Sequence, residues 1–303
     1  MRELAGKVAV ITGAASGIGR ALAGRCAAEG MRLALADIEA PALELAAAEL
    51  RAGGTEVLAV RTDVSRWEDV AALARSVVDA YGAAHLVCNN AGVAAGGTVW
   101  ETRLEDWRWV LGVNLWGVIH GVRAFTPILL ARKEGHIVNT ASIQGLITHH
   151  PFSSNYQVSK HAVLGLSEQL HHELAGTGVG VSVLCPGWVR TQIADASRNR
   201  PDYAPISAPG AFSPAQEETL EQCAEALRRG DDPERMAAAV LAAVREERFY
   251  VLPHPQWLPY VRARMEGILD GRAPGAAPVD ALACAPGVPA DESAGGPGRG
   301  PGG

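Results

Sequence analysis

The chain reads Thr12-Gly13-Ala14-Ala15-Ser16-Gly17-Ile18-Gly19 directly after a short apolar run at residues 8–11. An alanine-rich stretch with helical spacing, residues 21–29, follows this turn. Glycines let backbone N–H groups approach a pyrophosphate, and the N-terminus of the next helix adds partial positive charge. The spacing is G-x-x-x-G-x-G rather than the usual G-x-G-x-x-G. A plain glycine turn is the alternative, but the position between strand and helix favours phosphate binding.

Short runs rich in valine, isoleucine and leucine recur along the chain and alternate with stretches of helical spacing. Strands of a parallel sheet are continuously apolar because helices cover both of its faces. The pattern therefore predicts an α/β fold with a doubly wound, Rossmann-type parallel sheet and helices on both faces. The predicted strands are residues 8–11, 33–36, 57–60, 86–88, 137–138, 181–184 and 249–252, with early helices at 21–29, 42–50 and 70–80.

Two longer helices are predicted at residues 102–130 and 156–174, and Pro127 is expected to kink or end the first. Residues 201–214 are rich in proline, alanine and serine and interrupt the pattern after the sixth strand. Such an excursion predicts a substrate lid, at about residues 192–225.

We expect one domain at residues 1–272, because no shift in composition divides the chain before that point. Its last part is a C-terminal extension, about residues 253–272, with an amphipathic stretch at 260–269. This extension could cover a pocket, contact a neighbouring subunit or complete the core of its own domain. Residues 273–303 consist mainly of glycine, proline and alanine, which predicts a disordered tail.

The composition excludes several classes of function. The 303 residues carry a net charge of -6, which argues against a nucleic-acid partner. Five cysteines are widely spaced, so neither disulfides nor a zinc site is predicted, and no other metal site is expected. The sequence shows no leader and no apolar run of about 20 residues. We therefore expect a soluble, cytoplasmic protein without a membrane partner.

Asp37 ends the second predicted strand, at the distance from the turn where a carboxylate can bind the hydroxyls of an adenosine ribose. A carboxylate would also repel a 2'-phosphate. No lysine or arginine adjoins it in the sequence, because Ile38 follows and Ser16 precedes Gly17 in the turn. These residues predict NAD rather than NADP as the cofactor. The alternative for Asp37 is the N-cap of the next helix.

Tyr156 and Lys160 are four residues apart and therefore share one face of a helix. A tyrosine is a poor base at neutral pH, but a neighbouring cation lowers the pKa of its phenol. The pair by itself is common on helix surfaces. Its significance depends on the motifs around it.

From residue 7 to about residue 252 the chain resembles the short-chain dehydrogenase/reductase family in its single-domain form. The resemblance rests on five ordered motifs: the TGxxxGIG turn, Asp63-Val64, Asn89-Asn90-Ala91-Gly92, the YxxxK pair and Pro186-Gly187-Trp188-Val189-Arg190-Thr191. It implies a cofactor site formed by Gly13, Ser16, Gly17, Ile18, Gly19, Asp37, Asp63, Val64, Asn90, Ala91, Gly92, Tyr156, Lys160, Pro186, Gly187, Val189 and Thr191.

The resemblance also implies a catalytic tetrad of Asn114, Ser142, Tyr156 and Lys160. Ser142 would hydrogen-bond the substrate oxygen and Tyr156 would exchange its proton. Lys160 would hold the ribose and lower the pKa of Tyr156, and Asn114 would position a water linked to Lys160. Removing a hydride from carbon requires loss of the proton from oxygen, so this set of groups is chemically consistent.

Substrate contacts are expected from Gln144, His150, Phe152 and Trp188, which suggests an apolar or aromatic substrate. The expected activity is NAD-dependent interconversion of a secondary alcohol and a ketone. Reduction of an imine or alkene on the same fold is one alternative, and a catalytically silent dinucleotide sensor is another. The resemblance implies a homodimer or homotetramer built on the two long helices.

Overall fold

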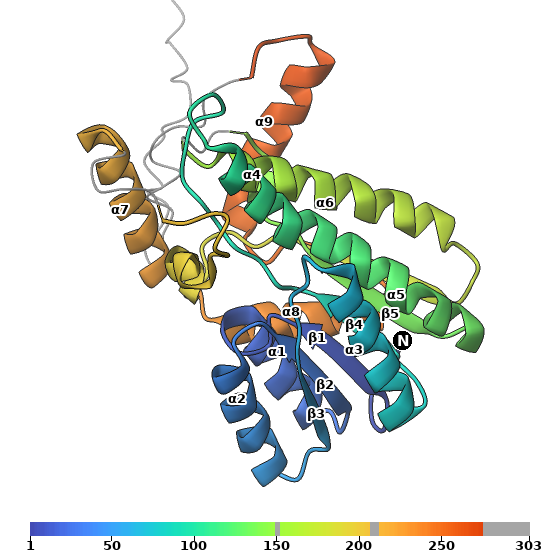
Figure 1. Cartoon of the computed structure of the whole chain (residues 1–303). Coiled ribbons are helices and arrows are strands. Elements are labelled where there is room, and N and C mark those ends of the chain that lie inside the picture. Colours follow the sequence, from blue (N-terminus) through green and yellow to red (C-terminus); the bar gives the residue numbers. More distant parts are fainter. Residues whose placement is uncertain (149–151, 207–211, 275–303) are drawn as a thin grey trace, which may run out of the picture.

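In a computed structural model, which describes residues 1–148, 152–206 and 212–274, the centre of the molecule is a seven-stranded parallel sheet (Figure 1). Its strand order is β3-β2-β1-β4-β5-β6-β7, so the direction of winding reverses between β1 and β4. The predicted doubly wound fold is confirmed. The strands are β1 Val8–Thr12, β2 Arg32–Asp37, β3 Val57–Arg61, β4 Leu86–Asn89, β5 Gly135–Thr140, β6 Val179–Leu184 and β7 Tyr250–Val251.

Helices cover both faces of this sheet. On one face Leu22 and Val240 pack with Leu33 of the sheet, and on the other Phe125 and Leu170 pack with its apolar strand residues. The first face carries α1 Gly17–Ala28, α2 Ala40–Ala52 and α8 Pro233–Glu246, and the second carries α3 Trp67–Tyr81, α5 Gly117–Arg132 and α6 Ser154–Glu173.

The first long helix does not break at its proline. It begins with α4, Leu104–Leu111, passes through a π-helical turn at Gly112–Trp116 and continues as α5 beyond Pro127. Pro127 was predicted to kink or end this helix, and the prediction that it ends the helix is wrong. Phe125 and Leu129 flank the proline and are buried against the sheet, which offsets the backbone hydrogen bond that proline removes.

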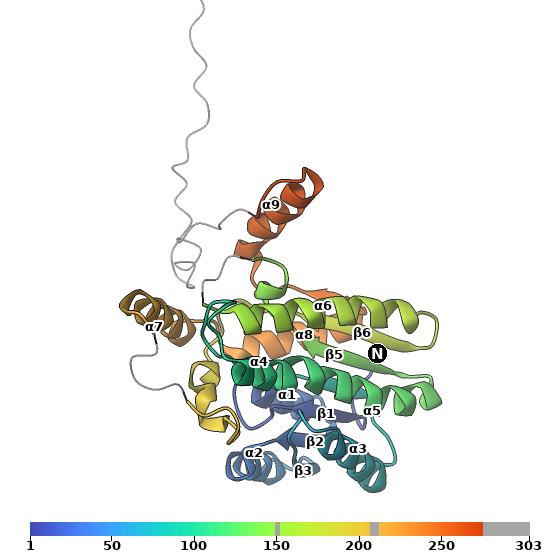
Figure 2. The same cartoon turned by 45° about the horizontal axis from the view of Figure 1, so that its top comes forward.

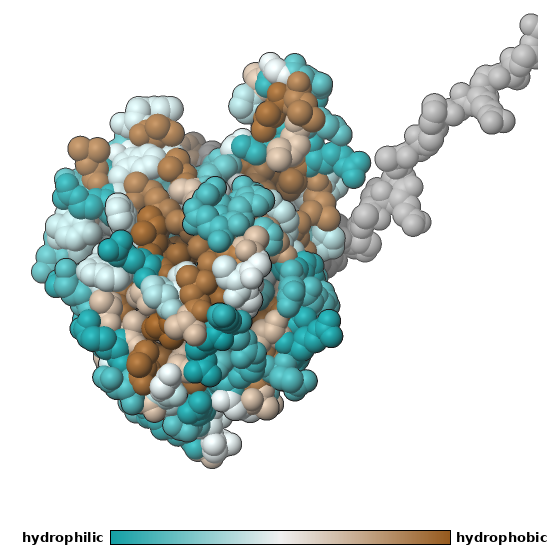
Figure 3. All heavy atoms as spheres, turned by 90° about the vertical axis from the view of Figure 1, so that its right-hand side faces the viewer, coloured by the Kyte–Doolittle hydropathy of each residue, from teal (hydrophilic) through white to brown (hydrophobic). Residues whose placement is uncertain are grey.

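Two helices stand apart from these layers (Figure 2). The predicted lid contains a 3-10 segment, Gln192–Asn199, and helix α7, Pro214–Arg228. Helix α9, Leu258–Leu269, projects from the body, and Met265, Ile268 and Leu269 give it exposed apolar surface (Figure 3). None of its residues is buried, so α9 itself adds nothing to the core, whereas Trp257 just before it is buried with Ile143 and Ile147. Apart from 273 and 274, the predicted tail lies outside the described residues.

The long run Leu104–Arg132 is the one helix among the described residues that is apolar and long enough to cross a membrane. Its apolar side chains have another use, because Val118, Phe125 and Leu129 pack in the core of the α/β fold. Length and composition are therefore explained by this packing.

A chain of buried amides connects the central strands to the helices that cover them. Asn89 donates from Nδ2 to Asn139 Oδ1 at 2.9 Å, and Asn139 donates from Nδ2 to Ser167 Oγ at 3.0 Å. Helix α5 passes close to Asn89 at Gly121, where an added Cβ would lie 1.9 Å from Asn89 Oδ1. Only glycine fits there while this chain of hydrogen bonds is intact.

Gly121→Ala should lower the free energy of unfolding by about 1–3 kcal/mol, since the methyl group must displace a hydrogen-bonded buried amide. The matched control is Gly165→Ala in helix α6, where no atom would lie within 4 Å of the added Cβ. The control should be neutral or stabilising by up to about 1 kcal/mol, because alanine favours helix. Thermal and denaturant unfolding of both variants measure the difference, and equal stabilities would contradict this account of Gly121.

Candidate active site

The glycine turn is held in a conformation that only glycine adopts without strain. Gly13 has φ +67° and Gly17 has φ +53°. A Cβ would lie 2.8 Å from Ala91 Cα at Gly13, and 3.0 Å from Thr191 Cγ2 at Gly17. The side chain of Ser16, at the N-cap of α1, makes no capping hydrogen bond. Ser16 therefore does not cap the first N–H groups of this helix. An anion site at a helix N-terminus requires N–H groups that no side chain caps.

A cavity of about 540 Å³ lies beside this turn, at the carboxyl ends of the strands. Of the residues predicted to bind the cofactor, those that line it are Gly13, Ser16, Gly17, Ile18, Asp37, Asp63, Val64, Asn90, Ala91, Gly92, Tyr156, Lys160, Pro186, Gly187, Val189 and Thr191. Gly19 does not line it. A Cβ there would lie 2.1 Å from the Gly13 carbonyl oxygen, so Gly19 lets the helix pack against the turn.

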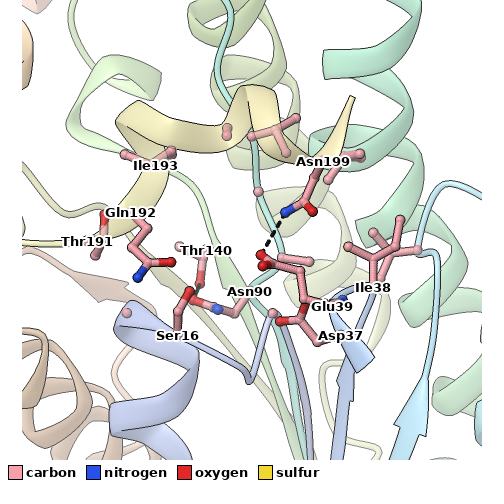
Figure 4. Close-up of a pocket in the computed structure, with 18 of the residues that line it drawn as sticks. Ser16, Asp37, Ile38, Glu39, Asn90, Thr140, Thr191, Gln192, Ile193 and Asn199 are labelled. Carbon is pink, nitrogen blue, oxygen red and sulfur yellow. Dashed lines mark hydrogen bonds between the residues drawn. The ribbon is translucent and has the colours of Figure 1, made fainter. Parts of the chain in front are cut away.

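Asp37 points its carboxylate into one end of the cavity (Figure 4). Its two oxygens accept hydrogen bonds from the backbone N–H groups of Ala15 and Glu39, both at 3.0 Å. Burial raises the pKa of this carboxyl group, while the two backbone hydrogen bonds oppose the shift. The N-cap of α2 is Glu39, so the alternative role of Asp37 as a helix cap is wrong.

Arg61 is a cavity residue that the sequence analysis missed. It ends β3 and is paired in register with Asp37 on β2, so the two side chains share one end of the cavity. Its Nη1 atom lies 3.8 Å from Asp69 Oδ2. No local pattern in the sequence indicates this neighbour, because the two positions meet only through strand pairing. No cation adjoins Asp37 in the sequence, but Arg61 lies beside it in the folded chain.

Tyr156 and Lys160 lie together at the other end of the cavity, with Lys160 Nζ 5.4 Å from the centre of the Tyr156 ring. Lys160 is 3% exposed and donates to the Thr140 carbonyl at 2.8 Å. Burial lowers the pKa of Lys160 to about 8. These values describe an ammonium group that the protein surrounds almost completely.

Tyr156 is partly exposed to the cavity but enclosed by protein on its other sides. This burial raises the pKa of its phenol to about 12, and a hydrogen bond with the Ser142 side chain opposes the rise. The sequence predicted that Lys160 lowers this pKa. In the protein alone, burial is the main influence on the pKa of Tyr156. The Lys160 ammonium group donates to the Thr140 carbonyl group.

Ser142 begins a short 3-10 turn, Ile143–Gly145, and its Oγ accepts from the backbone N–H of Gln144 at 3.2 Å. The same Oγ is 3.5 Å from the Pro186 carbonyl oxygen. Its hydrogen bond with Tyr156 brings the two predicted catalytic hydroxyl groups together. The two hydroxyl groups are therefore direct neighbours in the structure.

Asn114 lies in the π-helical turn and is fully buried. Its Oδ1 accepts from the backbone N–H of Val93 at 2.8 Å, and its Nδ2 donates to the Val93 carbonyl at 2.9 Å and to Ser159 Oγ at 3.0 Å. These contacts tie the loop after β4 to α6, as expected for a buried polar group bonded to backbone. A Cβ on Gly92 would lie within 3.7 Å of both Asn114 Oδ1 and Lys160 Nζ, so Asn114 borders the predicted site.

The predicted substrate residues are placed less uniformly. Gln144, Phe152 and Trp188 do not line the cavity, and His150 lies outside the described residues. Trp188 packs with Ile143 and Trp257 instead. The lid supplies cavity residues that the sequence analysis missed, because this segment has no periodic pattern: Gln192, Ile193, Ala196, Arg198, Asn199, Arg200, Pro201, Asp202 and Tyr203.

The C-terminal extension supports the Pro186–Gly187 loop. His254 is 3% exposed, and its Nδ1 accepts from the Gly187 backbone N–H at 3.0 Å. A Cβ on Gly187 would lie 2.7 Å from Trp257 Nε1. His254 Nε2 lies 3.2 Å from Asp231 Oδ2. The base of the extension therefore lies next to the cavity. This is one of the three positions that the sequence left open for the extension.

Fold and site together define an oxidoreductase with a dinucleotide-binding turn. A family model described as short chain dehydrogenase matches residues 7–202. The chain therefore belongs to the short-chain dehydrogenase/reductase family, as the sequence predicted.

Three similar proteins indicate the range of this family. The crystal structure of a short chain dehydrogenase/reductase from Burkholderia phymatum in complex with NAD is 48% identical, with a TM-score of 0.88, and the match covers 91% of this chain and 99% of that one. A metagenomic short-chain oxidoreductase in complex with NADP is 28% identical, with a TM-score of 0.63, over 80% and 92% of the two chains. The 1-deoxy-11-beta-hydroxypentalenate dehydrogenase of Streptomyces exfoliatus is 42% identical over 224 residues, 73% of this chain and 79% of that protein.

Tyr156→Phe should abolish turnover and leave cofactor binding measurable, because it removes the exchangeable proton and keeps the ring. The control is Tyr81→Phe in α3, which removes a hydroxyl group bonded to the Leu33 carbonyl at 3.0 Å, remote from the cavity residues. The control should retain activity. Steady-state rates and a fluorescence titration with reduced cofactor measure both properties, and normal turnover of Tyr156→Phe would refute the assignment.

Proposed function

We propose that the chain is an NAD-dependent oxidoreductase that interconverts a secondary alcohol and a ketone. The observation that carries the proposal is the arrangement of one cavity, which begins at the Asp37 carboxylate and ends at Tyr156 and Lys160. At the second end, the Ser142 side chain is hydrogen-bonded to Tyr156. One continuous space with these two ends supports a site for hydride transfer.

The residues of the cavity fit a dinucleotide. The glycine turn brings backbone close to the cavity at the uncapped end of α1, which suits a pyrophosphate. Asp37 suits the adenosine ribose, because a carboxylate held by two backbone N–H groups can accept further hydrogen bonds from hydroxyls. Lys160, at the Tyr156 end of the cavity, would hold the second ribose of the cofactor. NAD would supply the carbon that accepts or donates the hydride.

The residues of this chain would then handle the proton. The Ser142 hydroxyl donates a hydrogen bond to the substrate oxygen and stabilises its developing negative charge. Tyr156 accepts the alcohol proton in oxidation and returns it in reduction. Burial raises the pKa of this phenol, and a cation close to Tyr156 would lower it again. The positive charge of an oxidised nicotinamide ring is suited to that.

Asp37 and the NAD complex of the Burkholderia phymatum relative support NAD over NADP, whereas Arg61 and the NADP complex of the metagenomic relative oppose it. We favour NAD because Asp37 is fixed by backbone hydrogen bonds, while the Arg61 side chain is 57% exposed. A fixed charge at the ribose is more selective than a solvated one on a flexible side chain.

Oxidation of secondary alcohols should be more efficient with NAD than with NADP, and Asp37→Asn should narrow the ratio by at least about tenfold, since it removes a charge that repels the 2'-phosphate. Absorbance of the reduced cofactor across secondary, cyclic and sterol alcohols measures both kcat/KM values. A wild-type preference for NADP would refute the cofactor assignment. Binding of NAD without turnover of any alcohol or ketone would favour the sensor alternative.

We also propose a homodimer or homotetramer that uses the long helices α4–α5 and α6. Trp116 and Val158 are large apolar side chains on these helices that are 53% and 48% exposed, so contact with a second copy would remove apolar surface from water. Trp116→Lys should therefore reduce the assembly to a smaller species. Light scattering of the wild-type and variant chains measures the mass, and a monomeric wild type would refute the proposal.

A further inference from the structure

Glu39 lines the same end of the cavity as Asp37 (Figure 4). Its backbone N–H donates to Asp37 Oδ1 at 3.0 Å, so two carboxylate residues adjoin the expected adenosine ribose. Glu39 is the N-cap residue of α2, but its side chain makes no capping hydrogen bond to that helix. Helix capping therefore does not explain the orientation of this carboxylate.

The Glu39 carboxylate is bound by the lid. Arg198 donates from Nη2 to Oε1 at 2.7 Å and from Nε to Oε2 at 3.3 Å. Asn199 donates from Nδ2 to Glu39 Oε1 at 2.8 Å, and Figure 4 shows the side chains of Asn199 and Glu39 pointing toward each other. The hydrogen bond from Arg198 is the largest cause of the lowered pKa of Glu39, so the carboxyl group is ionised at neutral pH.

The position of Arg198 does not depend on Glu39 alone. Its Nη1 donates to the carbonyls of Gln192 and Asp195 at 3.0 and 2.9 Å, within its own segment. Two residues further, Arg200 pairs with the buried Asp106, and its guanidinium lies 4.5 Å from the centre of the Trp109 ring. The lid is anchored to α4 at this point, so loss of Glu39 would leave Arg198 at the edge of the cavity.

Arg198 would be a cationic ligand for a 2'-phosphate at this end of the cavity if Glu39 did not occupy it. A guanidinium binds phosphate with two parallel hydrogen bonds, as it binds a carboxylate. Of the other cavity arginines, Arg200 is committed to Asp106, whereas Arg61, 3.8 Å from Asp69, is a second cation at this end that the experiment must separate from Arg198. The charge of Arg198 is instead matched by the carboxylate at 2.7 Å.

We propose that Glu39 is a specificity-determining residue for the cofactor: it occupies the Arg198 guanidinium and so denies this cation to a 2'-phosphate. The inference rests on the proposed NAD-dependent function and adds a second carboxylate to Asp37. Asp37 repels the 2'-phosphate directly, whereas Glu39 acts by neutralising the cation that would attract it.

The test is a double-mutant cycle on the full-length chain, with Glu39→Ala, Arg198→Ala and the double variant titrated with NADPH and NADH. Glu39→Ala should lower the Kd for NADPH about tenfold or more, as expected when a phosphate gains a hydrogen-bonded arginine. The gain should vanish in the double variant, and the Kd for NADH should change less than the Kd for NADPH. Arg61→Ala added to Glu39→Ala should keep the gain.

Glu221→Ala is the matched control, because it also removes one carboxylate from an arginine, Arg228 on α7, that does not line the cavity. It should leave both Kd values unchanged. Circular dichroism and thermal unfolding show whether each variant is folded, and Glu39→Asp, which keeps the charge, should restore the discrimination if it still reaches Arg198.

An unchanged Kd for NADPH in folded Glu39→Ala would overturn the inference and leave the proposed function intact. A gain that persists in the double variant would also overturn it, since relief of repulsion near α2 would then suffice. A wild-type chain that prefers NADPH would refute the proposed NAD-dependent function itself. The wild type is therefore measured before any variant is made.

Discussion

The contact between the glycine turn and the loop after β4 is the constraint on which the site depends. Thr12 Oγ1 accepts hydrogen bonds from the backbone N–H groups of Asn90 and Ala91 at 3.0 and 3.1 Å, and Asn90 Nδ2 donates to the Thr12 carbonyl at 3.1 Å. A side chain at Gly13 would enter this contact. It lies where the sheet reverses its winding between β1 and β4, and that reversal opens the cavity at the carboxyl ends of the strands.

Buried polar contacts continue from this point to the reacting groups. The Asn89–Asn139–Ser167 chain connects β4 and β5 to α6, and Asn114 connects the next loop to Ser159 of the same helix. Helix α6 also carries Tyr156 and Lys160. Because unsatisfied buried amides are costly, these networks fix the helix against the sheet and thereby fix the distance between cofactor turn and phenol.

Segments outside the sheet complete the cavity. The extension supports Gly187 through His254, and the lid contacts the Asp37 end of the cavity through Arg198 and Asn199, which bind Glu39. Both contacts join loops to the rigid edge of the sheet, which is where binding specificity can vary without a change of fold.

The sequence by itself determined the strand–helix alternation, the glycine turn, Asp37 and the Tyr156–Lys160 pair. Each of these is a local requirement of backbone conformation or helical spacing, so a few neighbouring residues suffice to predict it. Only the tertiary structure decided that Pro127 stays within a helix, because buried neighbours compensate for it. It also placed Arg61 beside Asp37, Arg198 on Glu39 across 159 residues and His254 on Gly187 across 67. Such pairings leave no periodic signal in the sequence, since they arise from how distant segments pack around one cavity.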